Sequence, residues 1–129
     1  MKKLILLLLL FVALVAKAED SDKGIRFFKG SFAEALVEAN KQNKPLFVDF
    51  YAVWCVPCKH MAKEVFTQEE VGAYFNAHFI SLQVDAEKPG NVEIAKQYKV
   101  EAYPTVAFIA PDGKALAVNV GAMNREELL

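Results

Sequence analysis

Cys55 and Cys58 are the two residues whose type and spacing most directly predict chemistry. They are the only cysteines in the chain, and the two residues between them place the sulfur atoms close enough to bond. A cysteine thiolate attacks disulfides through a mixed-disulfide intermediate, which a second nearby cysteine can resolve. A disulfide across so short a loop removes little chain entropy, so a purely stabilising role is the weaker explanation. The pair therefore predicts thiol–disulfide exchange.

The position of the pair between a strand and a helix predicts which sulfur attacks. Residues 46–51 are nearly all apolar, as in a strand covered on both faces. We expect a helix to begin at the cysteines, with Pro57 in its first turn, and to run to about Phe66. Cys55 would then lie at the helix N-terminus, where free N–H groups lower a thiol pKa. Cys58, one turn further, is expected to be more buried and to resolve the mixed disulfide.

A zinc site is the main alternative for a Cys-x-x-Cys pair. Tetrahedral zinc needs four ligands, and the chain has no second cysteine pair. His60 and His78 are the only histidines; His60 points away from Cys58 on the predicted helix, and His78 is distant in sequence. We therefore expect no metal, and no cofactor other than the redox-active disulfide itself.

Strands and helices are predicted to alternate along the chain. We expect strands at residues 25–28, 46–51, 79–84, 105–110 and 114–120. Helices are expected over 32–42, from the cysteines to about 66, from 67 through 75, over 89–98, and from Asn124 onward. Two Ser/Thr-x-x-Glu capping boxes, at residues 31–34 and 67–70, support two of the helix starts. This order predicts an α/β fold with a central mixed sheet and helices on both faces.

The first 18 residues have the layout of a secretory signal peptide. A basic start is followed by 13 apolar residues, 4–16, and by Ala16-Lys17-Ala18, with small residues where a signal peptidase cleaves. Cleavage after Ala18 would leave a flexible lead-in at 19–24 and a single domain at 25–129. An uncleaved membrane anchor is the alternative, although 13 residues fall short of the roughly 20 that span a bilayer.

The charge of the predicted mature chain disfavours nucleic acid as a partner. Removal of residues 1–18 takes three of the 15 basic residues and none of the 16 acidic ones, which leaves a formal charge of −4. Phosphate backbones are bound by basic surfaces, so this balance points to other partners.

Residues 47–59, from Phe47 through Trp54 to Lys59, resemble the active-site segment of the thioredoxin superfamily. The segment 103–105 (Tyr-Pro-Thr) resembles the cis-proline loop of that family, and Asp112-Gly113 and Gly121 resemble its hairpin turn and final glycine. The match covers nearly all of residues 25–129 and implies a thioredoxin-like fold. The stretch 64–80 is similar to the thioredoxin-like domain of the DsbD-type periplasmic disulfide reductases and their secreted relatives.

The resemblance implies a role for several residues. Asp49 corresponds to the buried aspartate that takes up the proton of the resolving cysteine; a core aspartate without a role is the alternative. Pro104 corresponds to the cis-proline beside which substrate backbone pairs. The apolar substrate groove is implied to consist of Trp54, Val56, Pro57, Tyr103, Gly121 and Ala122. For Trp54 the alternative is core packing. Ser81 corresponds to the lysine that partners the aspartate in thioredoxin, so Asp49 is expected to depend on water instead.

These features together predict an extracytoplasmic, periplasmic reductase of protein disulfides. The resemblance implies a membrane electron donor of the DsbD/CcdA type. Val56 and Pro57 supply no charge and no side-chain donor between the cysteines, which favours a reducing potential. The alternatives are an oxidase or isomerase of the same fold, and a thioredoxin-fold binding module in which the cysteines are incidental.

Overall fold

The computed structural model describes residues 23–129. Its elements are α2 (Phe32–Gln42), β1 (Leu46–Tyr51), α3 (Val56–Glu64), α4 (Glu69–His78), β2 (Ile80–Asp85), α5 (Val92–Gln97), β3 (Thr105–Ile109), β4 (Ala115–Val120) and α6 (Arg125–Leu128). The predicted signal peptide and residues 19–22 of the predicted lead-in lie outside the described residues. Within residues 23–129, no helix is both long enough and apolar enough to cross a bilayer.

The four strands form one mixed sheet in the order β2-β1-β3-β4. β1 runs parallel to β2 and antiparallel to β3, and β3 and β4 form the closing antiparallel hairpin. The expected mixed α/β architecture is confirmed. Because β1 is central and buried along its first five residues, the cysteine motif that follows it starts from a fixed position.

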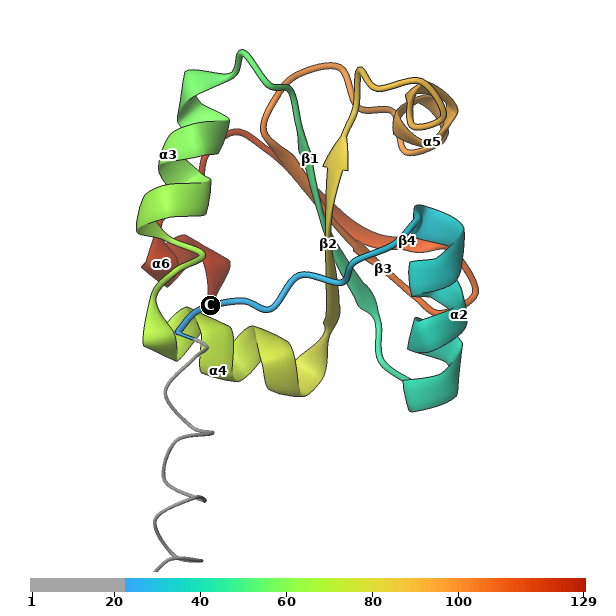
Figure 1. The fold of residues 1–129 in the computed structure, drawn as a ribbon, viewed down its shortest axis with the longest axis horizontal. Helices are drawn as coiled ribbons and strands as arrows, with labels where there is room; N and C mark the ends of the chain where they lie inside the picture. Colours follow the sequence, from blue (N-terminus) through green and yellow to red (C-terminus); the bar gives the residue numbers. More distant parts are fainter. Residues whose placement is uncertain (1–22) are drawn as a thin grey trace, which may run out of the picture.

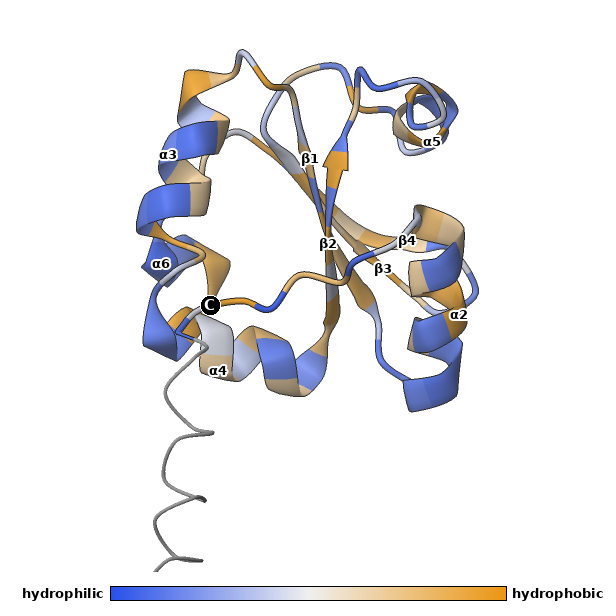
Figure 2. Ribbon diagram, viewed as in Figure 1, coloured by the Kyte–Doolittle hydropathy of each residue, from blue (hydrophilic) through white to orange (hydrophobic). Residues whose placement is uncertain are grey.

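Helices cover both faces of this sheet (Figure 1). On one face, α2 and α5 pack over a core that includes Leu46, Val48 and Phe50 of β1. On the other face, α3 and α4 pack over Phe47 and its aromatic neighbours. Strand residues alternate between faces, so one apolar strand supplies both cores. Figure 2 shows the hydrophobic colours gathered on the central strands and long hydrophilic stretches on α2 and α3.

Two helix starts follow the sequence signals. At α2, Ser31 Oγ accepts a hydrogen bond from the Glu34 N–H at 3.1 Å, and Glu34 Oε1 accepts one from the Ser31 N–H at 3.0 Å. This is the predicted capping box. At α6, Asn124 Oδ1 accepts from the Glu127 N–H at 2.8 Å, as its predicted N-cap role requires.

The predicted capping box at Thr67 and Glu70 is wrong. Thr67 Oγ1 instead donates to the carbonyl oxygen of Lys63 at 2.6 Å, so it terminates α3 rather than starting α4. The N-cap of α4 is Gln68, which makes no side-chain capping bond. α3 accordingly ends at Glu64, two residues before the predicted end.

Residues 25–28 form an isolated bridge, not the predicted strand. Phe27 pairs with Ser81 of β2, and the Phe28 N–H donates to the Ser81 carbonyl at 2.7 Å. At the other end, the Ile25 N–H donates to the carbonyl of Phe66 at 2.8 Å. The segment is held at one end by the loop after α3 and at the other by β2, so a single bridge is all that forms. α5 also starts later than predicted, because residues 86–91 form turns with Gly90 at positive φ.

Gly24, predicted to belong to a flexible lead-in, is packed into the domain. It is buried, with a φ of 95°, and its backbone lies against Gly72 of α4 so closely that a Cβ on either residue would clash. Asn76 Nδ2 also donates to the Gly24 carbonyl at 3.1 Å. Gly24 is therefore part of the packed domain rather than of the predicted flexible lead-in.

Candidate functional site

Cys55 and Cys58 form a disulfide at the N-terminus of α3, with their Cα atoms 5.3 Å apart. Cys55 is the N-cap residue, as predicted, and its Sγ accepts a hydrogen bond from the Cys58 N–H at 3.2 Å. Pro57 lies in the first turn, where its missing N–H leaves no helix bond unmade. A negative charge on the Cys55 sulfur would be stabilised by this N–H group and by the helix dipole.

The predicted difference in burial between the two cysteines is wrong. Cys55 is 2% exposed and Cys58 is 3% exposed. Tyr51 and Tyr103 pack against the small cluster formed by both cysteines and Ala52, so aromatic side chains shield the disulfide as a whole. The chemical distinction between the two sulfurs therefore rests on the helix N-terminus rather than on exposure in the disulfide form.

The loop before β3 lies against the cysteines. The Tyr103–Pro104 peptide bond is cis, and Tyr103 contacts the cysteine cluster. The Gly121 N–H donates to the Pro104 carbonyl at 2.8 Å, which joins this loop to the end of β4. Thr105 Oγ1 donates to the Ala102 carbonyl at 2.7 Å and closes the loop. The end of β1, the start of β3 and the end of β4, which are far apart in sequence, thus meet at one end of the sheet.

Trp54 is exposed rather than packed in the core. Its side chain is 63% exposed, so the alternative of core packing is wrong. The indole is nevertheless held: Nε1 donates to Glu87 Oε1 at 2.6 Å, and the ring lies edge-on to Tyr103 with centroids 5.9 Å apart. Glu87 was not identified from the sequence, because only the fold brings the loop after β2 beside Trp54.

The remaining predicted groove residues differ in exposure. Val56, Pro57 and Ala122 are exposed, Gly121 is partly exposed, and Pro104 is buried. Val56 lies beside the cysteines at the start of α3, and Gly121 is bonded to the cis-proline loop.

Asp49 lies on β1 and is 1% exposed. Burial raises the pKa of its carboxyl from 3.8 to about 7, an effect that a hydrogen bond from Gln83 partly opposes. Gln83 Nε2 donates to Oδ2 at 3.5 Å, while Oδ1 has no hydrogen-bond partner within residues 23–129. A buried carboxyl that titrates near neutral pH can accept and return a proton under ordinary conditions.

The residue paired with Asp49 is Gln83, not Ser81. In the parallel register of β1 and β2, Asp49 lies opposite Gln83 and Phe47 lies opposite Ser81. The expectation that Asp49 depends on water alone therefore needs correction, because a side-chain amide reaches it. The prediction failed because it required the register between β1 and β2. Ser81 and Gln83 lie on the same face of β2, and the sequence alone does not determine which of them lies opposite Asp49.

A cavity of about 320 Å³ is lined by both Asp49 and Cys58. Its lining residues are Asp49, Tyr51, Ala52, Val53, Cys58, Lys59, Ala62 and Gln83. One water molecule takes about 30 Å³ of liquid volume, so the cavity has room for water between Asp49 and Cys58. The predicted acid and the predicted resolving cysteine thus share one solvent-sized space.

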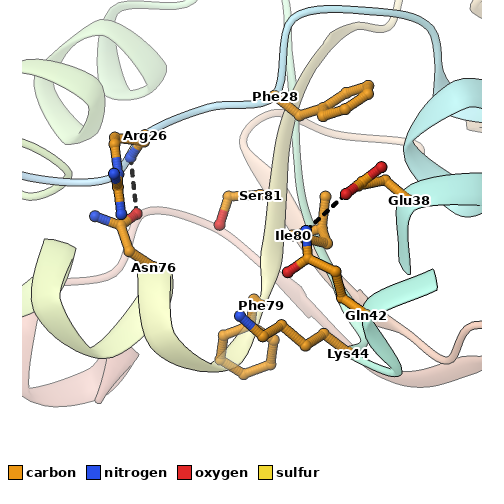
Figure 3. A pocket seen from close by; sticks show the side chains of 9 residues that line it. All are labelled: Arg26, Phe28, Glu38, Gln42, Lys44, Asn76, Phe79, Ile80 and Ser81. Atoms are coloured by element: carbon orange, nitrogen blue, oxygen red, sulfur yellow. Dashed lines mark hydrogen bonds between the residues drawn. The ribbon is translucent and has the colours of Figure 1, made fainter. Parts of the chain in front are cut away.

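A second cavity, of about 360 Å³, lies away from the cysteines (Figure 3). It lies where β2 begins, and its walls include Arg26, Lys44 and Asn76. Gln42 Nε2 donates to Glu38 Oε1 across one wall, and the Arg26 N–H donates to Asn76 Oδ1 on the other. It contains no cysteine and none of the predicted site residues, so it is separate from the redox site.

The histidines do not gather with the cysteines. His60 is exposed on α3, and His78 is exposed at the end of α4, where its ring lies tilted against that of Tyr74 with centroids 4.5 Å apart. Within the part of the chain that the structure describes, no three His, Cys, Asp or Glu residues are arranged to hold a metal ion.

A family model described as a thioredoxin-like domain matches residues 32–129. The chain therefore belongs to the thioredoxin-like family, whose redox group is the cysteine disulfide itself. The thiol:disulfide interchange protein DsbD of Pseudomonas fluorescens is 38% identical over 80 residues, which are 61% of this chain and 14% of DsbD. The mitochondrial Thioredoxin-3 of Saccharomyces cerevisiae is 39% identical over 82 residues, or 64% of this chain and 59% of that protein.

Solved structures support the same family. A protein of Bacteroides thetaiotaomicron described as a candidate disulphide isomerase superposes with a TM-score of 0.74 at 45% identity, covering 84% of this chain and 90% of that one. The oxidised C-terminal domain of Neisseria meningitidis DsbD superposes with a TM-score of 0.62 at 29% identity, covering 78% and 91%. The chain thus matches one domain of DsbD, and only a small part of the whole DsbD protein.

Proposed function

We propose that this protein reduces disulfide bonds in other proteins by dithiol–disulfide exchange through Cys55 and Cys58. The observation that carries the proposal is the disulfide at the N-terminus of α3, whose first sulfur accepts the N–H of Cys58. A binding module with incidental cysteines needs neither a cysteine sulfur that caps the helix nor a buried acid that lines the same cavity as the second cysteine. Two similar proteins are named for disulfide chemistry, one as a thiol:disulfide interchange protein and one as a candidate disulphide isomerase, and these names support the same choice.

The proposed cycle begins with the reduced pair. The Cys55 thiolate attacks one sulfur of a substrate disulfide, a mixed disulfide forms, and the other substrate sulfur leaves as a thiolate. Cys58 then loses its thiol proton to Asp49 and attacks the Cys55 sulfur. The Cys55–Cys58 disulfide forms, the second substrate sulfur leaves with the bonding electrons, and the substrate is reduced by two electrons. An external thiol donor must then reduce the pair again.

Substrate is proposed to bind along the apolar surface that surrounds the disulfide. Trp54 and Val56 are strongly exposed there, and Tyr103 contacts both the Trp54 ring and the cysteine cluster. Pro104 has no N–H of its own, so an extended substrate backbone can approach that edge. Pro57, Gly121 and Ala122 complete the proposed groove.

The direction of electron flow is proposed from the residues between the cysteines. Val56 and Pro57 add neither charge nor a side-chain hydrogen-bond donor near Cys55. These two residues therefore add nothing to the thiolate stabilisation that the helix N-terminus supplies, and a moderately stabilised thiolate is typical of reducing pairs. An oxidase or isomerase remains the second candidate, since one similar structure is described as a candidate isomerase.

Export from the cytoplasm is proposed from residues 1–18. Their basic, apolar and small-residue segments fit a cleaved signal peptide, and similarity to a DsbD domain fits a periplasmic location and a membrane electron donor of the DsbD/CcdA type. Mitochondrial and chloroplast thioredoxins are also among the relatives, so similarity alone does not choose the compartment. N-terminal sequencing of exported protein should find Glu19 first, and an intact leader would contradict this proposal.

Reduction of insulin is the test of the proposed function. With dithiothreitol as the electron donor, catalytic amounts of the protein should accelerate insulin disulfide reduction by at least about tenfold over the donor alone, because a thiolate stabilised at a helix N-terminus attacks disulfides faster than the mostly protonated thiols of dithiothreitol. The measurement is the precipitation of reduced insulin chains with time. Equal rates with and without the protein would reject the enzyme and favour a binding module.

A further inference from the structure

The cavity at the start of β2 has the size of a small-molecule site. Its volume of about 360 Å³ lies within the range of about 300–1,000 Å³ that ligand pockets have. It lies at the edge of the sheet, because β2 is an outer strand. From one face of the sheet α2 contributes Glu38 and Gln42 to the walls, and from the other face α4 contributes Asn76. The cavity is therefore a hollow between two helices, across the edge of the sheet.

Ser81 is the most buried polar side chain in this cavity. It is 3% exposed, and its Oγ has no hydrogen-bond partner within residues 23–129. Figure 3 shows the hydroxyl between a wall that carries Arg26 and Asn76 and a wall that carries Gln42. A buried hydroxyl that makes no hydrogen bond destabilises the fold, and an alanine at the same place would not. The Ser81 hydroxyl therefore points to a ligand that enters this cavity.

The amide side chains of the cavity are already bonded within the protein. Asn76 Oδ1 accepts from the backbone N–H of Arg26 at 2.9 Å, and Asn76 Nδ2 donates to the Gly24 carbonyl at 3.1 Å. Gln42 Nε2 donates to Glu38 Oε1 at 2.7 Å. These bonds fix the walls, so a ligand must be held by the other polar groups.

Two of those other groups are cations. Within residues 23–129, the Arg26 guanidinium and the Lys44 ammonium form neither an ion pair nor a side-chain hydrogen bond. Of the described lining residues only Glu38 is acidic, and its carboxylate is bonded to Gln42. Both α2 and α4 end beside the cavity, and helix C-termini favour cations, so an anion needs both side-chain cations to bind. A hydroxyl donor and two cations match the acceptor oxygens of an anion.

The rest of the lining is apolar and favours an organic anion. Phe28, Phe79 and Ile80 line the cavity, and each is partly buried. Inorganic phosphate has no apolar part that could cover these side chains. A carboxylate on a short hydrocarbon chain can place its oxygens at the donors and remove apolar surface from water.

We propose that this cavity binds a small organic carboxylate. The carboxylate oxygens accept from the Ser81 hydroxyl and from the side chains of Arg26 and Lys44, and the short apolar chain lies against Phe28 and Phe79. The site is separate from the cysteines, so this inference goes beyond the proposed function and does not depend on it. Binding is reversible, and no covalent bond forms or breaks.

Titration of the protein with sodium butyrate, followed by the ¹H–¹⁵N shifts of its backbone amides, is the test. The amides of Ser81 and Phe79 should shift and saturate with a dissociation constant on the order of millimolar, as expected for a ligand of six heavy atoms. Acetate lacks two methylene groups and should bind about tenfold more weakly, since each buried methylene strengthens binding about fourfold. Phosphate should also bind more weakly than butyrate, and butylamine should not bind.

Three substitutions separate the proposed contacts. Ser81→Ala should weaken butyrate binding by about tenfold, because it removes a hydrogen bond to a charged group. Arg26→Gln and Lys44→Gln should each weaken it by about threefold, since both cations remain partly open to solvent. Lys63→Gln is the matched control: Lys63 is exposed on α3 and does not line the cavity, so binding should be unchanged.

Three results would overturn the proposal. One is the absence of saturating shifts at Ser81 and Phe79 up to about 100 mM butyrate, well above the expected dissociation constant. A second is equal binding by the wild-type protein, Ser81→Ala and Arg26→Gln. Because Arg26 is exposed, Arg26→Gln keeps this comparison valid even if Ser81→Ala does not fold. The third is binding of phosphate or butylamine as tight as that of butyrate, which would reject an organic carboxylate as the ligand.

Discussion

Cys58→Ser will trap this protein in covalent complexes with its substrates, while Cys55→Ser will trap almost none. The Cys55 sulfur caps the N-terminus of α3 and is proposed to form the first bond to substrate. Cys58 is the only other cysteine in the chain, so it alone can break that mixed disulfide from within the protein. A well-oriented intramolecular group reaches an effective concentration of about 10⁵ M or more. Loss of Cys58 should therefore slow release of the mixed disulfide by about 1,000-fold or more.

Non-reducing gels and intact mass measure this result directly. Each molecule of the Cys58→Ser protein should carry one covalently bound substrate chain, and dithiothreitol should release that chain. Ala77→Ser, at an exposed position on α4, is a control for the serine substitution and should keep full insulin reduction. Equal trapping by the two cysteine variants would remove the argument from the helix N-terminus.

Asp49→Asn will stabilise the fold at alkaline pH and leave it nearly unchanged at acid pH. The folded carboxyl has a pKa of about 7, against an ordinary value of 3.8. Between these values the unfolded chain loses a proton that the folded chain keeps, so the wild-type protein loses stability as pH rises from about 4 to 7. Above pH 7 the full penalty applies, and an uncharged asparagine should recover on the order of 2–4 kcal/mol.

Thermal unfolding at pH 4 and at pH 8.5 measures this difference. Glu93→Gln removes an exposed carboxyl on α5 and should change the melting temperature little at either pH. The same Asp49 substitution should slow mixed-disulfide release most strongly above neutral pH, because the base is lost. A stabilisation that is equal at both pH values would show that the carboxyl is not held protonated by burial.

Local sequence signals predicted the elements that hold the cysteines. The apolar strand before Cys55 and the proline after it defined β1 and the start of α3, and the capping residues Ser31 and Asn124 fixed two other helices. These signals succeed because each depends on residues within one turn or one strand of the chain.

Features that depend on tertiary contacts were not predictable in the same way. Thr67 has the spacing of an N-cap, yet its hydroxyl donates back to Lys63, because helix and cap compete for the same local bonds. The shielding of the cysteines comes in part from Tyr103, nearly 50 residues later. The pairing of Gln83 with Asp49 depends on strand register, which is set by the packing of both sheet faces.

The reduction potential of the Cys55–Cys58 pair tests the central proposal most directly. Equilibration of the protein with glutathione, followed by alkylation and mass measurement of the reduced fraction, gives this value. We predict a potential close to the thioredoxin value of about −270 mV, because neutral Val56 and Pro57 add nothing to the helix N-terminus that stabilises the thiolate. A potential above about −180 mV, the region of protein disulfide isomerase, would contradict a reductase and favour an oxidase or isomerase.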